Sequence, residues 1–230
     1  MKLFCLPYAG GSSSTYFQWK DYFSEKLEIV SIELPGRGTR LDEPLITNFS
    51  QLVEEILQSI IENIDINEEF QLFGHSLGGL LAYSVSNRIE KLPHGKLNRL
   101  YLSATRTPDS FRQEKNSDSQ SSGELLKHLS NLGGIPHELT KNQEFLDYFL
   151  PIIQADFSVI QSYSLYEEHG KPAVPTVILN GNDDETVTKF ENNWANYLQK
   201  IVEIKRFKGN HFFINKYPDQ VCRFIHNQIQ

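Results

Sequence analysis

The chain has 230 residues, a net charge of −7 and only two cysteines. A chain of this length buries enough apolar surface to fold without a disulfide or a structural metal, so we expect one domain over residues 1–230 with free thiols. No basic block could neutralise the phosphates of a nucleic acid, and no apolar stretch is as long as a membrane span. We therefore predict a cytoplasmic monomer that binds neither nucleic acid nor membranes and needs no metal or cofactor.

Short apolar runs alternate with amphipathic stretches along the chain, which is typical of a mostly parallel sheet flanked by helices. The predicted strands are Leu3–Leu6, Glu28–Leu34, Phe70–Phe73, Arg99–Ser103, Thr176–Leu179 and Val202–Phe207. The predicted helices are Tyr16–Leu27, Ser50–Ile64, Leu77–Glu90, Thr188–Gln199 and Asp219–Gln228. The expected fold class is therefore α/β.

The alternation breaks over residues 105–175. The stretch DSFRQEKNSDSQSSG is polar, and we expect high mobility over residues 109–124. Two later stretches have a helical pattern, with Pro151 at the start of a new helix. Helices inserted into an α/β fold often cover a site at the strand ends, so we interpret 105–175 as a helical lid. Ordinary packed surface helices are the alternative.

The stretch FGHSLGGL places Ser76 between Gly74 and Gly78, after a predicted strand and before a predicted helix. This order is that of the nucleophile elbow of α/β hydrolases. The sharp turn presses the residues two before and two after the serine together, so only glycine fits at both positions. It also exposes the serine hydroxyl and points the Leu77 amide to where an oxyanion would bind.

A serine hydroxyl becomes a good nucleophile only when a histidine accepts its proton and a carboxylate orients the histidine. In this fold the acid and then the histidine follow the serine along the chain. Of the histidines after Ser76, His211 directly follows the last predicted strand. Asp184 follows the strand before it and is preferred to Asp183 as the acid. The elbow turns His75 away from the serine hydroxyl, so we assign it to packing.

The loop LPYAGGSSSTY follows the first predicted strand. We expect a backbone N–H of this loop, that of Ala9, to complement the Leu77 amide as the second oxyanion donor. A phosphate-binding loop is the rival interpretation, but no Gly-Lys-Ser/Thr sequence follows.

Several segments resemble the type II thioesterases that accompany nonribosomal peptide and polyketide synthases. They are LFCLPYAGGSSSTYFQWKDYF, IELPGRGTRLDEPL, FQLFGHSLGGLLAY, PIIQADFSVIQSY and FKGNHFFI. These segments are distributed almost from one end of the chain to the other. Tyr8 stands where the family often has histidine, and Asn210 where it often has glycine. The family's Gly-x-x-Asp pattern matches Gly181 and Asp184.

The resemblance implies an α/β-hydrolase fold with an inserted lid, and hydrolysis of acyl thioesters on the phosphopantetheine arm of carrier proteins. Ser76, Asp184 and His211 would form the catalytic triad, and the amides of Ala9 and Leu77 the oxyanion hole. The family role is removal of stalled or mis-primed acyl groups. A medium-chain fatty acyl thioesterase, a general serine esterase and a non-catalytic interaction protein are the alternatives.

Three further polar residues lie in the family-like segments. Arg37 and Arg40 belong to the Pro-Gly-Arg-Gly-x-Arg segment, and Asp156 to the Ala-Asp-Phe segment. The two arginines either contact anionic groups near the entrance or hold their loop to the core, and we favour the structural role. Asp156 is expected to orient the lid by an ion pair or a cap, without taking part in the chemistry.

Overall fold

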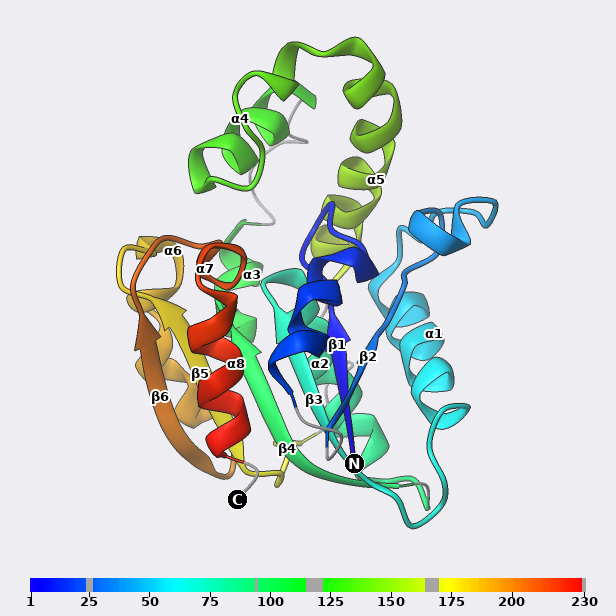
Figure 1. The fold of residues 1–230 in the computed structure, drawn as a ribbon, viewed down its shortest axis with the longest axis vertical. Helices are drawn as coiled ribbons and strands as arrows, with labels where there is room; N and C mark the ends of the chain where they lie inside the picture. The colour runs from blue at the N-terminus through cyan, green and yellow to red at the C-terminus, as the bar shows by residue number, and fades with distance from the viewer. Residues whose placement is uncertain (24–26, 94, 115–121, 164–169, 229–230) are drawn as a thin grey trace.

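The computed structural model describes residues 1–23, 27–93, 95–114, 122–163 and 170–228 (Figure 1). Within these residues, parallel strands form one six-stranded sheet in the order β2-β1-β3-β4-β5-β6. The strands are β1 (Lys2–Leu6), β2 (Glu28–Ser31), β3 (Glu69–His75), β4 (Lys96–Ser103), β5 (Thr176–Gly181) and β6 (Ile201–Phe207). The predicted α/β architecture is confirmed, although β2 ends three residues before the predicted Leu34.

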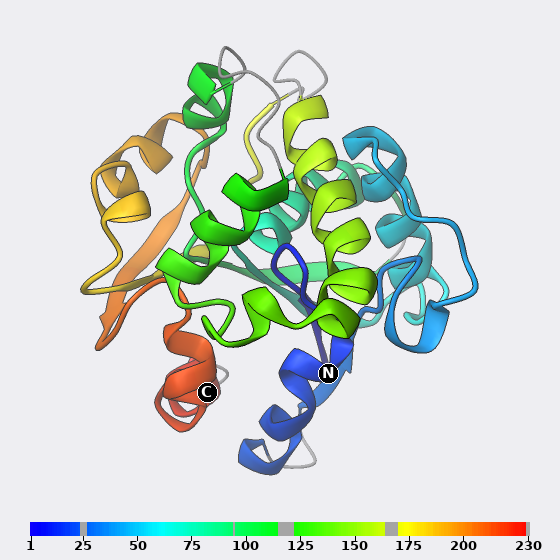
Figure 2. The ribbon, with the colours of Figure 1, turned by 90° about the horizontal axis from the view of Figure 1, so that it is seen from above.

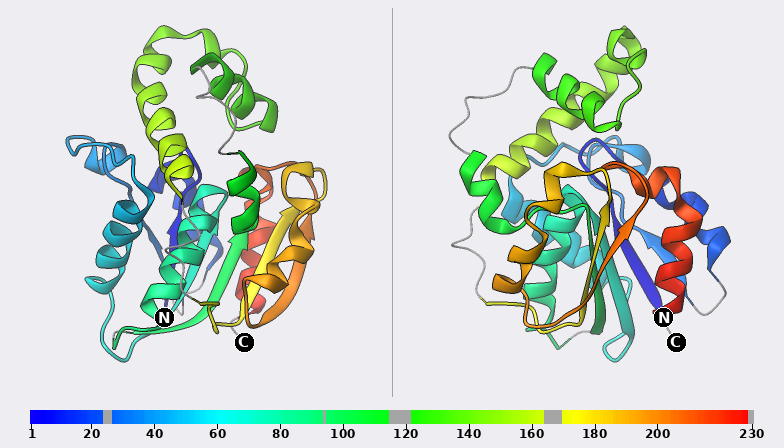
Figure 3. Two further views of the ribbon diagram at one scale, coloured as in Figure 1. Left: turned by 180° about the vertical axis from the view of Figure 1, so that it is seen from behind. Right: turned by 90° about the vertical axis from the view of Figure 1, so that its left-hand side faces the viewer.

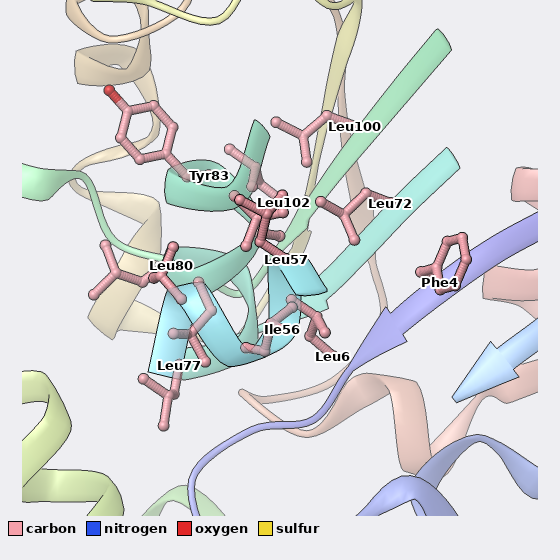
Figure 4. Packing of buried hydrophobic residues seen from close by; sticks show 14 of the residues in the cluster. Phe4, Leu6, Ile56, Leu57, Leu72, Leu77, Leu80, Tyr83, Leu100 and Leu102 are labelled. Atoms are coloured by element: carbon pink, nitrogen blue, oxygen red, sulfur yellow. The ribbon is translucent and has the colours of Figure 1, made fainter. Parts of the chain in front are cut away.

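The larger core lies between the sheet and two helices, α1 (Phe49–Ile61) and α2 (Leu77–Ile89). Both helices are in front of the sheet in the left panel of Figure 3. Apolar side chains of α1 pack here against α2 and side chains of β1, β3 and β4 (Figure 4). Helix α2 packs against α1 as well as against β1, β3 and β4, and all of its residues except Arg88 are buried.

The second core lies on the opposite face of the sheet. It is covered by the 3₁₀ segment η1 (Ser13–Tyr22) and by α8 (Pro218–Asn227), which are in front in Figure 1. Alternate residues of a strand point to opposite faces, so Phe4 lies in the first core and Cys5 in the second. Cys5 and Cys222 are buried free thiols, as expected, and burial raises the pKa of both.

Two predicted helices take a different form. The segment expected as the helix Tyr16–Leu27 is the shorter η1, and Thr188–Gln199 is replaced by α6 (Glu185–Thr188) and the 3₁₀ segment η5 (Glu191–Asn196). A 3₁₀ helix has three residues per turn, so side chains at i and i+3 lie above one another. The buried residues follow that spacing: Ser13, Tyr16 and Trp19 in η1, and Glu191 and Trp194 in η5.

The prediction that Pro151 begins a helix is wrong. Helix α5 is continuous from Gln143 to Ser162 and contains Pro151. Its N-terminus is set by Asn142, whose side chain accepts a hydrogen bond from the Phe145 amide at 2.9 Å. The apolar face of α5 continues on both sides of the proline, and this packing outweighs the one backbone hydrogen bond that proline removes.

Residues 105–175 contain α3 (Pro108–Glu114), α4 (Ser122–Leu132), the 3₁₀ turn η3 (Leu139–Lys141) and α5. Figures 1 and 2 show that α4 and α5 lie beyond the carboxyl ends of the strands. Within the stretch 109–124 expected to be mobile, residues 115–121 lie outside the described residues, 109–114 belong to α3 and 122–124 to the start of α4. Helix α3 forms where no helix was predicted, because Phe111 packs into the first core. That this region acts as a lid stays a prediction.

None of the helices in the described ranges combines the length and apolar character needed to cross a bilayer.

Candidate active site

Ser76 lies between the end of β3 and the start of α2 in a strained backbone conformation. Its φ is 56° and its ψ is −116°, a region that L-residues rarely adopt. A Cβ on Gly74 would lie 2.0 Å from the carbonyl oxygen of Gly78, and one on Gly78 would lie 2.3 Å from that of Leu6. Both glycines are therefore required by contacts with backbone atoms, as the elbow predicts.

The elbow is fastened to its surroundings by backbone hydrogen bonds. The Ser76 amide donates to the Ser103 carbonyl at 2.8 Å, and the Ser76 carbonyl accepts from the amides of Gly79 and Leu80. The hydroxyl of Thr105 lies 3.2 Å from the same carbonyl. These contacts offset the strain and leave the Ser76 side chain free to point out of the turn.

The three side chains predicted as a triad meet at the carboxyl ends of the strands. His211 Nε2 lies 3.0 Å from Ser76 Oγ, and His211 Nδ1 lies 2.6 Å from Asp184 Oδ2. His211 lies in the loop between β6 and α7 (Phe213–Lys216), and Asp184 directly precedes α6. Asp183, the alternative acid, is exposed to solvent. The structure thus brings together the three side chains predicted as the triad.

The absence of a side chain at Gly181 allows Asp184 and His211 to approach each other. A Cβ on Gly181 would lie 2.4 Å from the Asn210 carbonyl oxygen, so any side chain there would push the His211 loop away from β5. The side chain of Asn210 accepts a hydrogen bond from the Phe212 amide at 3.1 Å. This bond helps shape the loop on the C-terminal side of His211.

Thr186 is a site residue that the sequence reasoning missed. Its amide and its hydroxyl both donate to Asp184 Oδ1, at 3.1 and 2.5 Å. Burial alone would raise the pKa of Asp184, but the hydrogen bonds from His211 and Thr186 outweigh it and hold this pKa below its ordinary value. The carboxylate is therefore charged and oriented at neutral pH. A threonine two residues after an aspartate at a helix start is the signal that could have indicated this cap.

His75 packs behind the site and does not contact the serine hydroxyl. Its ring is fully buried, its Nδ1 lies 2.8 Å from Ser103 Oγ, and its ring centre lies 5.4 Å from that of His211. Burial, and then the positive charge that His211 can carry, lower the pKa of His75 well below its ordinary value. His75 is therefore neutral at pH 7.

This lowered pKa predicts acid sensitivity. The unfolded chain binds a proton on His75 below about pH 6.5 and the folded chain does not, so stability is lost as pH falls through that value. We expect His75→Gln to remove a slope of up to about 1.4 kcal/mol per pH unit between about pH 6.5 and 5. Urea unfolding over this range measures it. The exposed His137→Gln serves as the control, and an unchanged slope in His75→Gln would contradict the prediction.

The two predicted oxyanion donors lie on the same cavity as Ser76. Ala9 belongs to the loop of residues 7–12 between β1 and η1, here called the β1–η1 loop, and Leu77 is the first residue of α2. In the described part of the chain, neither amide donates a hydrogen bond to a protein group. The Leu77 amide also lies at the positive end of the α2 dipole. Both N–H groups are therefore available to a ligand oxygen.

The cavity has a volume of about 360 Å³ and is mainly apolar. Its far wall comes from the helices over the strand ends, with Phe111, Leu129, Leu132, Phe157 and Ile160. Ser76 and His211 lie on its wall, whereas Asp184 lies behind the histidine. An apolar chain in the cavity would place its polar end at the serine.

The site residues offer acid–base and nucleophilic chemistry. Among the described residues, no cluster of three or more histidine, cysteine, aspartate or glutamate side chains is arranged to hold a metal ion.

Arg37 and Asp156 form an ion pair beside the β1–η1 loop, whereas Arg40 pairs with Glu43 and Glu55 at the surface.

Comparisons with known proteins agree with this geometry. The family model described as a thioesterase domain matches residues 1–229. The gramicidin S biosynthesis protein GrsT of Aneurinibacillus migulanus is 28% identical over 231 residues, which cover 100% of this chain and 89% of that protein. The medium-chain S-acyl fatty acid synthase thioesterase of Rattus norvegicus is 27% identical, covering 99% of this chain and 86% of that protein. The crystal structure of ClbQ from the colibactin NRPS/PKS pathway has a TM-score of 0.87 and 27% identity, covering 99% of this chain and 96% of that one.

Proposed function

Since the chain belongs to the thioesterase domain family, we propose that it is a serine thioesterase acting in trans on carrier proteins. Its substrates are acyl thioesters on the phosphopantetheine arm, and its role is to remove stalled or mis-primed acyl groups in nonribosomal peptide or polyketide biosynthesis. The observation that carries the proposal is the aligned Ser76, His211 and Asp184 at the wall of an apolar cavity. Similarity to GrsT and ClbQ supports the pathway class.

The proposed reaction has two halves. Ser76 Oγ attacks the thioester carbonyl carbon while His211 Nε2 accepts its proton, and Asp184 stabilises the imidazolium that forms. The amides of Ala9 and Leu77 bind the negative oxygen of the tetrahedral intermediate. The C–S bond then breaks, and His211 returns the proton to the departing pantetheine thiol. Water, deprotonated by His211, then attacks the carbonyl carbon of the acyl-serine. The bond from that carbon to Ser76 Oγ breaks, His211 returns the proton to Oγ, and the free acid leaves.

The main alternative is a medium-chain fatty acyl thioesterase. The rat fatty acid synthase relative and the apolar lining of the cavity favour it. Both enzymes would use the same Ser76 chemistry, so the two proposals differ only in the acyl groups and carriers they accept. A general serine esterase would show no preference for a pantetheine thioester. A non-catalytic interaction protein would have no use for a strained serine held against a histidine.

Mass spectrometry of acyl-loaded carrier proteins tests the proposal. Carriers bearing acetyl, aminoacyl, medium-chain and long-chain groups are incubated with the wild type and with Ser76→Ala. We expect the wild type to convert short-chain and aminoacyl carriers to the free-thiol form, and the variant to leave them loaded. Preferential removal of medium-chain groups would favour the fatty acyl alternative. Hydrolysis of nitrophenyl esters with every carrier left loaded would reject both.

The proposal also includes a monomeric enzyme whose partners are acyl or peptidyl carrier domains. The pathway proteins named among the relatives support these partners. The monomeric state and the cytoplasmic location remain predictions.

A further inference from the structure

Arg37 and Asp156 form a buried ion pair beside the β1–η1 loop. Arg37 Nη1 and Nη2 donate to Asp156 Oδ2 and Oδ1, each at 2.7 Å, in a parallel two-bond arrangement. The side chains are only 3% and 0% exposed. Asp156 lies on α5 and Arg37 directly precedes the short 3₁₀ turn η2 (Gly38–Arg40), so the pair joins segments 119 residues apart.

Both members of the pair also hold the backbone of the β1–η1 loop. The Gly10 amide donates to Asp156 Oδ2 at 2.7 Å, and Arg37 Nη1 donates to the Gly11 carbonyl at 3.3 Å. Gly10 has a φ of +75°, and a Cβ there would lie 3.1 Å from Ile153, which is one turn before Asp156 on α5. The loop is therefore fitted closely against one face of α5.

Two hydrogen bonds, one within the loop and one from Gly10 to Asp156, fix the peptide planes on either side of Ala9. The plane that carries the Ala9 N–H also carries the Tyr8 carbonyl, which accepts from the Gly11 amide at 2.8 Å. The next plane carries the Gly10 N–H, which Asp156 holds. With both planes fixed, the direction of the Ala9 N–H is set by the ion pair as well as by the turn.

Stability alone does not explain such a pair. A buried ion pair loses the hydration of both charges, and replacing it with apolar residues of similar volume is often neutral or stabilising. Beyond packing, the pair provides a charged carboxylate that accepts a hydrogen bond from one particular amide, that of Gly10, in a fixed direction. In addition, Phe157 and Ile160 of the same helix line the cavity, so α5 contacts the acyl region and holds the loop at once.

We infer that Arg37 and Asp156 are positioning residues for the hydrolysis: through Gly10 and Gly11 they orient the Ala9 amide toward the oxyanion. The inference rests on the proposed function, because only an acyl-transfer reaction develops charge on that oxygen. A misplaced donor weakens binding of the transition state but hardly changes binding of the substrate. The expected signature is therefore a loss in kcat with an almost unchanged KM.

Asp156→Asn is the first test. It keeps the shape of the side chain but gives up the charge and one of the acceptor oxygens. With an acyl-pantetheine thioester, we expect kcat to fall about 100-fold and KM to change less than about threefold. Arg40→Gln is the matched control, since it removes ion pairs from the neighbouring surface segment, and it should retain wild-type kcat. Wild-type kcat in folded Asp156→Asn would overturn the inference.

A double variant separates positioning from folding. Arg37→Met/Asp156→Leu removes both charges, so no unpaired charge stays buried, and we expect its thermal stability to recover. Its kcat should stay low, because the Gly10 amide has lost its acceptor. Recovery of kcat together with stability would assign the pair to structure only and reject positioning.

A measurement on the wild type covers the case in which neither variant folds. Amide hydrogen exchange followed by NMR should show Gly10 as protected as the central amides of α5, because Asp156 joins the two. Exchange of Gly10 at the rate of a free loop would overturn the inference. Failure of the proposed function looks different, since the wild type itself would then leave all thioesters intact.

Discussion

Replacing His211 with alanine is expected to lower kcat for thioester hydrolysis by about 10⁴- to 10⁶-fold with little change in KM. The Ser76 hydroxyl would lose the only base within hydrogen-bond reach among the described residues, at 3.0 Å. Ser76→Ala should cost a similar factor. Because the two side chains act as a unit, the double variant should be no slower than either single one. Single-turnover hydrolysis of an acyl-pantetheine thioester measures all three.

The exposed His137→Ala is the control for this series and should retain full activity. Asp184→Asn is expected to lose about 10⁴-fold, at the lower end of the range for His211→Ala, because the base remains but its orientation and charge are no longer stabilised. If the losses of Ser76→Ala and His211→Ala multiplied in the double variant, the two would not share one step, and the proposed mechanism would be wrong.

Alanine at Gly74 or at Gly78 is expected to destabilise the protein by more than about 3 kcal/mol. Each added Cβ would lie within 2.3 Å of a carbonyl oxygen, of Gly78 in the first case and of Leu6 in the second. These are backbone atoms of α2 and β1, so no flexible side chain can move aside. Relief of the contact would have to open the junction between helix and sheet. Urea unfolding gives the change in free energy.

Gly123→Ala is the matched control, because nothing lies within 4 Å of the added Cβ. Gly123 lies near the start of α4, where alanine favours the helix, so stability should stay within about 1 kcal/mol of the wild type, on the stabilising side. A Gly78→Ala variant as stable as Gly123→Ala would mean that the Leu6 carbonyl does not approach the elbow as closely as the structure describes.

The parallel sheet and the elbow could be predicted because their signals are local. Apolar runs of strand length mark the position of all six strands, although the predicted bounds cover only part of β3, β4 and β5. A serine between two glycines indicates the sharp turn when it lies between a strand and a helix. The order of triad residues along the chain narrowed the candidates for the base and the acid. The position of His211 after the last predicted strand, and of Asp184 after the strand before it, then led to the choice of these two. Their hydrogen bonds follow once neighbouring parallel strands end at the same edge of the sheet.

Other elements depend on contacts that no local pattern contains. Pro151 looks like a helix start, yet α5 continues through it because both halves of the helix bury apolar side chains. The 3₁₀ form of η1 is accompanied by burial of every third residue. A pattern search based on the 3.6-residue period of an α-helix does not detect this spacing. The sequence shows Thr186 only as a possible cap two residues after an aspartate, whereas its role at the site depends on the tertiary position of the Asp184 carboxylate beside His211.

Local patterns in the chain were enough to locate the six strands and the strained serine between Gly74 and Gly78, and the order of the triad along the chain narrowed its candidate partners. Which amide Asp156 holds, and where α5 lies over the cavity, follow only from the packed fold. Asp156 and Gly10 are 146 residues apart, and their hydrogen bond exists only because helix α5 packs against the β1–η1 loop. Long-range contacts of this kind arise from the summed packing of the whole chain, which no short stretch of residues encodes.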